Sequence, residues 1–246
     1  MYTLAIATQK GGTGKTTTAA ALAAELTKAG YNLLVVDADP QGNLSRTMLQ
    51  DQAENTLYDV LQNRVPAVSA TYKARYGHII APGDGLKGKD PITDPEPAYA
   101  LKRALEGQKR AYDICIIDCP PNLGQLTVAA LTAADGVIVP ARPERYSIDG
   151  LRELERTCHA IRQSTNKRLQ LLGVIITQYQ QQVVLQQGIV SALGVQARAL
   201  RTKVYQPPVR FTATVGKWQY EGVTRCTAQQ DYAELTAQIL ADMKLK

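Results

Sequence analysis

The chain has 246 residues, 45% of them hydrophobic, and a formal net charge of +6. This length and apolar content suffice for a full core, so we expect residues 1–246 to form a single domain. The absence of a run of 18 apolar residues argues against a transmembrane helix, and four cysteines without paired spacing predict reduced thiols and a cytoplasmic location.

The first predicted element is a buried strand over residues 2–8, which leads into a glycine-rich loop and a helix over residues 15–29. Glycine permits a tight turn and the close approach of a polyphosphate. The N–H groups of such a loop, and the amino end of the following helix, bind phosphate oxygens. The nucleotide-binding residues predicted from this chemistry are Gly11, Gly12, Thr13, Gly14, Lys15, Thr16 and Thr17.

Three side chains of this loop differ in what they can do. Lys15 can reach the β- and γ-phosphates of a nucleotide, and the Thr16 hydroxyl can bind Mg²⁺. Lys10 lies too early in the loop to bind the phosphates from the usual side. Its presence therefore needs a separate explanation.

Residues 33–36 form a second continuous apolar run. Strands without polar alternation are covered on both faces, which favours a parallel sheet with helices on either side. A phosphate loop at the first turn of a strand–helix–strand unit predicts the α/β fold of a P-loop NTPase, with a doubly wound, mostly parallel sheet.

Two aspartates, Asp37 and Asp39, follow the second strand. Strand ends at this edge of the sheet point toward the ligand. Two carboxylates are costly to hold close together unless a cation or a water network uses them. We predict that Asp39 positions water or contacts the metal and that Asp37 is structural, while a turn-capping role for Asp39 before Pro40 is the alternative.

The middle of the chain is less regular. Residues 43–63 predict two short helices, the second capped by Thr56, and residues 77–82 predict a short strand. Proline and glycine cluster in residues 83–97, which we expect to form a surface loop before a helix over residues 98–108.

A strand over residues 112–118 ends in Asp118. In phosphate-loop NTPases a carboxylate at this position holds Mg²⁺, directly or through water. The predicted metal site is therefore Thr16, Asp39 and Asp118. Pro120 and Pro121 end the strand and stiffen a loop that can sense the γ-phosphate.

The remaining elements alternate between helix and strand. They are a helix over 125–134, a strand over 136–140, a helix over 147–162 capped by Ser147, a strand over 171–177, and helices over 183–193 and 228–243.

The charge is divided unevenly along the chain. Residues 1–150 contain 15 basic and 16 acidic side chains, whereas residues 151–246 contain 13 basic and 6 acidic ones. No acidic residue occurs from Arg156 to Tyr220, a stretch with nine basic side chains. A basic surface of this kind attracts polyanions, although an ordinary solvated face is the alternative.

Three motifs together resemble those of the ParA/Soj branch of the deviant Walker-A ATPases, a family that also contains MinD. They are Lys10-Gly11-Gly12-Thr13-Gly14-Lys15-Thr16-Thr17, Asp37-Ala38-Asp39-Pro40-Gln41-Gly42-Asn43 and Asp118-Cys119-Pro120-Pro121. The resemblance implies a slow ATPase that uses ATP and Mg²⁺ and that a partner protein stimulates.

The resemblance also implies roles for individual residues. Lys10 would reach across a homodimer to the phosphates of the partner's ATP, so that two protomers enclose two nucleotides. Lys10 and Lys15 would stabilise charge, and Asp39 would orient the attacking water. Pro207 lies where a proline near the adenine is expected.

For the basic half of the chain, the resemblance implies DNA binding without sequence preference. The candidate DNA-binding residues are Arg198, Arg201, Lys203, Arg210 and Lys217. A ParB-like adaptor would then link the protein to a plasmid or chromosome, and the protein would be associated with the nucleoid.

Other functions stay open at this stage. A MinD-like ATPase needs a basic amphipathic helix for the membrane, but Asp231, Glu234 and Asp242 make the polar face of the last helix acidic. We therefore expect its apolar stripe to face the core and expect no membrane partner. An electron carrier of this fold would need a second cysteine beside Cys119. A ParA-like ATPase that positions a protein cargo would have nearly the same sequence.

Overall fold

The computed structural model describes residues 1–88, 96–215 and 226–245. The strands are β1 (Tyr2–Ile6), β2 (Leu33–Asp37), β3 (Tyr72–Lys73), β4 (His78–Ile80), β5 (Ile114–Asp118), β6 (Gly136–Ala141) and β7 (Gln170–Ile176). They form one sheet in the order β3-β4-β2-β5-β1-β6-β7. Neighbouring strands are parallel except β3 and β4, so the predicted doubly wound, mostly parallel α/β fold is confirmed.

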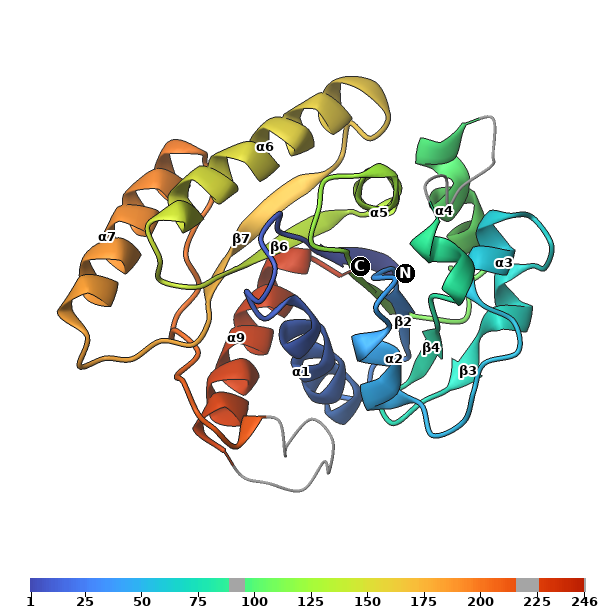
Figure 1. Ribbon diagram of the computed structural model, residues 1–246, viewed down its shortest axis with the longest axis horizontal. Coiled ribbons are helices and arrows are strands. Elements are labelled where there is room, and N and C mark those ends of the chain that lie inside the picture. Colours follow the sequence, from blue (N-terminus) through green and yellow to red (C-terminus); the bar gives the residue numbers. More distant parts are fainter. Residues whose placement is uncertain (89–95, 216–225, 246) are drawn as a thin grey trace.

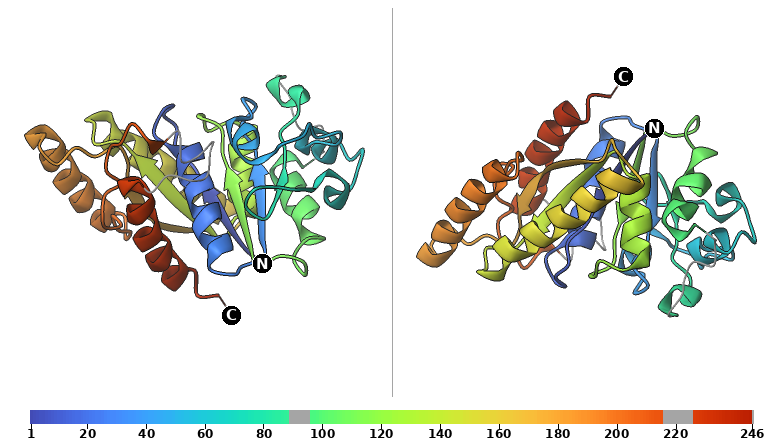
Figure 2. Two further views of the ribbon diagram at one scale, coloured as in Figure 1. Left: turned by 90° about the horizontal axis from the view of Figure 1, so that it is seen from below. Right: turned by 90° about the horizontal axis from the view of Figure 1, so that it is seen from above.

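Helices cover both faces of this sheet (Figure 1 and Figure 2). They are α1 (Lys15–Lys28), α2 (Asn43–Met48), α3 (Leu57–Leu61), α4 (Pro97–Glu106), α5 (Gln125–Ala133), α6 (Tyr146–Ser164), α7 (Val184–Ala199) and α9 (Thr227–Met243), with short 3₁₀ turns η1 (Ala67–Ala70) and η2 (Asp84–Lys87). Side chains alternate across the sheet, so Leu4 and Ile6 pack toward α1, α2 and α9. Ala5 and Ala7 pack toward the helices α3 to α7.

Several predicted elements differ in detail. Helix α7 continues to Ala199 rather than ending at 193, which places Arg198 in its last turn. Ser147 does not cap α6, because the helix begins at Tyr146 and the Ser147 hydroxyl donates to the Arg142 carbonyl at 2.6 Å. Thr56 does cap α3, and both its N–H and its hydroxyl donate to Asp59.

The predicted loop over 83–97 contains η2 and ends where α4 begins at Pro97, while residues 89–95 lie outside the described part of the chain. Strand β3 is absent from the sequence prediction. It has two residues, too few for a recognisable alternation, and it pairs antiparallel with β4 at the edge of the sheet.

The apolar stripe of α9 is part of the core, as predicted. Tyr232, Leu235, Ile239 and Met243 are all buried in the cluster that α9 shares with α1. The Tyr232 hydroxyl also makes a 2.9 Å hydrogen bond with Thr18 of α1. Within the described ranges, no helix has the length and hydropathy needed to cross a bilayer.

The outer edge of β7 is closed by the chain that follows α7. The N–H of Val174 donates to the Lys203 carbonyl at 2.8 Å, and the N–H of Tyr205 donates to the Val174 carbonyl at 2.9 Å. Tyr205 is buried, and its ring lies where a side chain on Gly173 would be, since a Cβ there would lie 2.3 Å from Tyr205 Cε2.

This packing predicts that Gly173→Ala destabilises the protein by about 1–3 kcal/mol, because the ring must move to admit the methyl group. Urea unfolding measures the change. Gly188→Ala is the matched control, since Gly188 lies within α7 with no atom within 4 Å of its Cβ position. The control should be neutral or slightly stabilising. Equal stability of Gly173→Ala and the wild type would contradict the packing argument.

Candidate nucleotide site

The predicted site residues meet at the carboxyl edge of the sheet. The strands β1, β5 and β2 are neighbours, with Ile6 in register with Asp118 and Asp37 in register with Asp118. The loop between β1 and α1 crosses this edge. Gly12 and Gly14 have left-handed backbones, with φ of +72° and +88°, which explains why glycine is needed at both positions.

This loop is held from its outer side by the end of β7. The Thr177 hydroxyl donates to the Thr13 carbonyl at 2.7 Å, and the Gln178 amide donates to the Gly12 carbonyl at 3.2 Å. In the described part of the chain, the N–H groups of Gly11, Gly12 and Gly14 donate to no protein acceptor. With its carbonyls engaged and these donors available, the loop fits a polyphosphate.

Sequence reasoning missed Thr177 and Gln178 as supports of the loop. Both follow β7 directly and so lie at the same sheet edge as the other site residues. Their position at the end of the predicted strand over 171–177, and directly after it, was the available signal.

Lys15 is a buried cation at the floor of this loop. Its side chain is largely buried, and its ammonium donates to the Lys10 carbonyl at 3.3 Å. Burial lowers the pKa of Lys15, and the negative charge of Asp118 partly opposes that shift. An anionic ligand beside the ammonium would therefore restore the stability of its charged form.

The Thr16 hydroxyl and the Asp118 carboxylate place two possible metal-ligand oxygens next to Lys15. The Thr16 hydroxyl donates to Asp118 Oδ2 at 2.8 Å. The other carboxylate oxygen, Oδ1, is buried and has no hydrogen-bond partner among the described residues. Burial, and then the neighbouring Asp37, raise the pKa of Asp118 well above its usual range.

An unpartnered buried carboxylate oxygen beside a hydroxyl fits Mg²⁺, which prefers oxygen ligands and retains several waters. Residues 1–88, 96–215 and 226–245 contain no group of three His, Cys, Asp or Glu side chains that could hold a metal. A magnesium ion held by Thr16 and Asp118 would therefore take its other ligands from phosphate oxygens and water.

Asp37 and Asp39 have different surroundings. Asp37 is fully buried and accepts hydrogen bonds from the N–H and the hydroxyl of Ser45, both at 2.8 Å, which agrees with a structural role. Asp39 Oδ1 accepts from the Gln41 N–H at 3.0 Å, which is the turn-capping geometry considered as the alternative. Its roles in positioning water and in contacting the metal stay predictions.

Lys10 does not join the phosphate cradle with its side chain. Its ammonium forms an ion pair with Glu144, in the loop between β6 and α6. Glu144 also pairs with Arg142 at 3.1 Å. The hydrogen bond from Lys10, with the charge of Arg142, lowers the pKa of Glu144. Sequence reasoning missed Glu144, although it follows β6, which lies beside β1.

A pocket of about 260 Å³ lies beside the loop. It is lined by Gly14 and Thr17 of the loop and α1, by Gln178 after β7, and by the segment from Val209 to Thr212. Its position next to the phosphate cradle suits a nucleoside. Pro207 is not among the residues that line it.

The candidate DNA-binding residues differ in whether acidic side chains of the chain already pair with them. Arg210 makes a 2.7 Å ion pair with the buried Asp231 of α9, and its N–H also donates to Asp231. Lys203 pairs with Asp242 at 2.6 Å and lies over the Tyr205 ring. These two cations are therefore already engaged within the chain.

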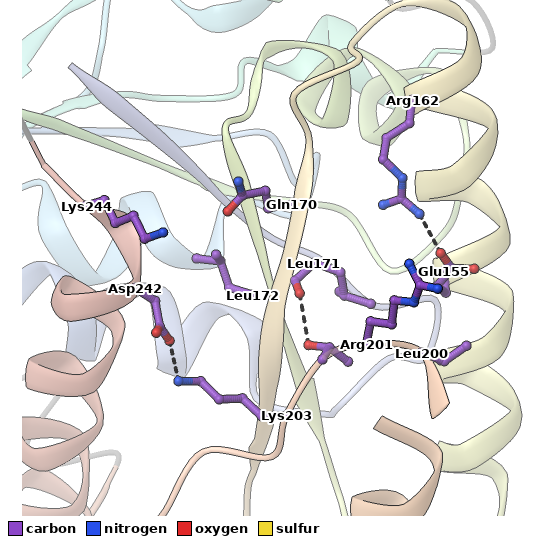
Figure 3. Close-up of a pocket in the computed structure, with 11 residues that line it drawn as sticks. Glu155, Arg162, Gln170, Leu171, Leu172, Leu200, Arg201, Lys203, Asp242 and Lys244 are labelled. Atoms are coloured by element: carbon purple, nitrogen blue, oxygen red, sulfur yellow. Dashed lines mark hydrogen bonds and ion pairs between the residues drawn. The ribbon is translucent and has the colours of Figure 1, made fainter. Parts of the chain in front are cut away.

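Arg198 and Arg201 form no ion pair with the described residues. Arg201 lines an open pocket of about 730 Å³ at the amino end of β7, together with Arg162, Lys203 and Lys244 (Figure 3). Lys217 lies outside the described residues.

The four cysteines, Cys115, Cys119, Cys158 and Cys226, are all free and buried. Burial raises the pKa of the Cys119 thiol far above its usual range. Buried, protonated thiols are unreactive, which agrees with the predicted reduced thiols.

The raised pKa values predict a pH dependence of stability for the protein without nucleotide and magnesium. The pKa of Asp37 is 3.8 in its unperturbed form and about 6 in the fold. As pH rises between these values, the unfolded state loses its proton first. The contribution of Asp37 therefore makes the free energy of unfolding at pH 7 lower than that at pH 4 by on the order of 3 kcal/mol.

Asp118→Asn should reduce this loss of stability, because the Asp118 carboxyl, whose pKa is raised by burial and then by Asp37, is replaced by an amide that does not titrate. Melting temperatures between pH 4 and pH 7.5 test both statements. Parallel curves for Asp118→Asn and the wild type would contradict the raised pKa of Asp118 in the fold.

Comparison with known proteins agrees with this geometry. A family model described as an AAA domain matches residues 1–171. The chain is 37% identical to the chromosome partitioning protein ParA of Caulobacter vibrioides, over 97% of this chain and 93% of the relative. It is 38% identical to the chromosome-partitioning ATPase Soj of Thermus thermophilus, over 77% of this chain and 74% of that protein.

Among solved structures, cobyrinic acid a,c-diamide synthase from Mycobacterium smegmatis, with bound ATP analogue and magnesium, superposes with a TM-score of 0.86. It is 31% identical, with 99% of this chain and 96% of that chain covered. Since one fold carries several activities, the sequence relatives are the better guide to the family. The chain belongs to the ParA/Soj group of partition ATPases, within the MinD/ParA family of P-loop proteins.

Proposed function

We propose that this protein, acting as one P-loop ATPase domain, hydrolyses ATP to drive the segregation of DNA. The observation that carries the proposal is the Thr16–Asp118 oxygen pair beside the buried Lys15, under a loop whose N–H groups are available. The names of the ParA and Soj relatives support partition as the purpose of the hydrolysis.

ATP would lie with its phosphates in the loop from Gly11 to Thr17 and its base in the pocket beside Gln178. Lys15 would neutralise charge on the β- and γ-phosphates. Thr16 and Asp118 would hold Mg²⁺, which supplies further charge neutralisation when bound. A water oxygen attacks the γ-phosphorus, the bond to the β–γ bridging oxygen breaks, and ADP and phosphate leave. Asp39 would orient that water.

We further propose an ATP-sandwich homodimer. Lys10 belongs to the phosphate loop, yet its ammonium contacts Glu144 rather than the cradle of its own chain. A lysine placed this way can serve a partner's nucleotide. A cation delivered across an interface stabilises the γ-phosphate only when the dimer is closed, so ATP would favour dimerisation and hydrolysis would end it.

Lys10→Ala tests this arrangement. ATP binding by the monomer should stay largely intact, because Lys15, Thr16 and the loop remain. Hydrolysis should fall by about 10²- to 10³-fold and the ATP-dependent dimer should be lost, since one charge-stabilising donor is missing. Isothermal titration, phosphate release and light scattering after size exclusion measure the three quantities. A mutant that still dimerises with ATP contradicts this role of Lys10.

We propose that the dimer binds DNA without sequence preference. Support comes from the acid-free basic stretch and from Arg198 and Arg201, which are not engaged in ion pairs with the described residues. Two protomers would bring twice as many cations to the DNA phosphates, and each neutralised phosphate steepens the salt dependence of binding. Lys203, Arg210 and Lys217 stay candidates, the first two with weaker support because Asp242 and Asp231 already hold them.

The double variant Arg198→Ala/Arg201→Ala should weaken ATP-dependent DNA binding at least about tenfold. The slope of log K against log salt should fall by about 0.9 for each phosphate that the variant no longer neutralises. Fluorescence anisotropy with random duplex DNA at several salt concentrations measures both. Lys28→Ala is the control, since Lys28 is an exposed cation on α1. An unchanged salt slope would exclude these arginines as DNA-binding residues.

A ParB-like adaptor would stimulate hydrolysis and release the protein from DNA, and the protein would then be cytoplasmic and associated with the nucleoid. The alternative is a membrane-associated positioning ATPase like MinD, or one that positions a protein cargo. The burial of the α9 stripe disfavours a membrane role for that helix. Liposome sedimentation beside the DNA assay separates these functions, because liposome binding without DNA binding would overturn partition.

A further inference from the structure

The Lys10 side chain is held outside the phosphate cradle by residues of its own chain. Its ammonium pairs with Glu144, which follows β6 at the edge where β1 also ends. The preceding residue, Gln9, donates to Glu153 of α6 at 3.0 Å. The start of the phosphate loop is thus attached to α6 and to the loop before it.

The backbone of Lys10, in contrast, belongs to the cradle. Its carbonyl accepts hydrogen bonds from the Lys15 ammonium at 3.3 Å and from the Thr13 hydroxyl at 3.4 Å. Rotation of the side chain alone can therefore release the ammonium from Glu144, and the loop that binds the phosphates need not move.

We propose that Glu144 is a positioning residue that holds the Lys10 ammonium within its own protomer until the partner's nucleotide replaces Glu144 as the anion bound to Lys10. This inference rests on the proposed ATP-dependent dimer. In the single protomer, Glu144 is the anion that Lys10 contacts. In the closed dimer, a γ-phosphate with more charge than one carboxylate competes for the same ammonium. The strength of the Lys10–Glu144 pair then sets how much ATP the dimer requires.

The solvent exposure of the Lys10–Glu144 ion pair determines how strongly the pair can oppose dimerisation. The Lys10 and Glu144 side chains are 44% and 33% exposed, so water and salt weaken their attraction. Pairs of this kind change an equilibrium by roughly two- to fivefold. Each dimer opens two of them, one in each protomer, so the effect enters twice.

Arg142 gives the proposal a second, opposite test. Its guanidinium also pairs with Glu144, at 3.1 Å, and so shares the carboxylate with Lys10. Removal of Arg142 leaves Glu144 to Lys10 alone and should strengthen the pair. Removal of the Glu144 charge should free Lys10. A residue with only a structural role would not produce shifts of opposite sign.

The experiment measures the dimerisation constant of the full chain with magnesium and ATPγS by analytical ultracentrifugation. Glu144→Gln should tighten the dimer by about 4- to 25-fold, and Arg142→Gln should weaken it by about 2- to 5-fold. Both shifts should shrink at high salt. Asp149→Asn is the control, because Asp149 forms an exposed pair with Arg152 on α6, 3.5 Å apart, and should leave the constant unchanged.

Thermal melting of each variant confirms that it is folded. A Glu144→Gln dimer as weak as the wild type or weaker overturns the inference, as does a shift of the same sign in both variants. If the wild type dimerises with ATPγS in those cases, only the inference fails and the proposed function stands. If neither the wild type nor any variant dimerises with ATPγS, both the inference and the sandwich dimer are overturned.

Discussion

The structure depends on keeping unlike charges buried together at one edge of a parallel sheet. Lys15 and Asp118 lie there with Asp37. Burial lowers the pKa of Lys15 and raises the pKa of both aspartates, so it favours the neutral form of each group. These shifts mean that the fold without ligand keeps its charges at some cost to stability. The attraction of Lys15 for Asp118 offsets part of that cost, and a magnesium polyphosphate would offset more. The binding of such a ligand and the stability of the fold are therefore linked.

The strand β7 connects this edge to the rest of the molecule. Thr177 and Gln178 at its carboxyl end hold the carbonyls of the phosphate loop, so the loop keeps its N–H groups toward a ligand. The chain after α7 pairs with the outer side of the same strand and supplies one wall of the pocket beside the loop. Arg210 attaches this wall to Asp231 of α9. These contacts join the phosphate loop, β7 and α9 into one packed unit.

The family, the fold and the positions of the main site residues could be predicted from the sequence, because each depends on short-range order. Continuous apolar strands that alternate with helices require a parallel sheet. In such a sheet the carboxyl ends of neighbouring strands must meet, so Thr16 and Asp118 were predicted near each other and lie 2.8 Å apart. Burial could be predicted in the same way, because the helical spacing of the apolar residues of α9 places them on one face, which packs in the core.

The tertiary structure decided what each polar side chain contacts, since those partners come from distant parts of the sequence. Arg210 and Lys203 have the charge of DNA-binding residues, but buried or half-buried aspartates of α9 hold them. Asp39 caps a turn as well as facing the ligand edge. The family resemblance assigned Lys10 to a partner's nucleotide, but only the adjacency of β1 and β6 shows that Lys10 pairs with Glu144 within its own chain. Composition and spacing determine which elements form. The order of the strands in the sheet determines which charged side chains pair with one another and which are available to a ligand.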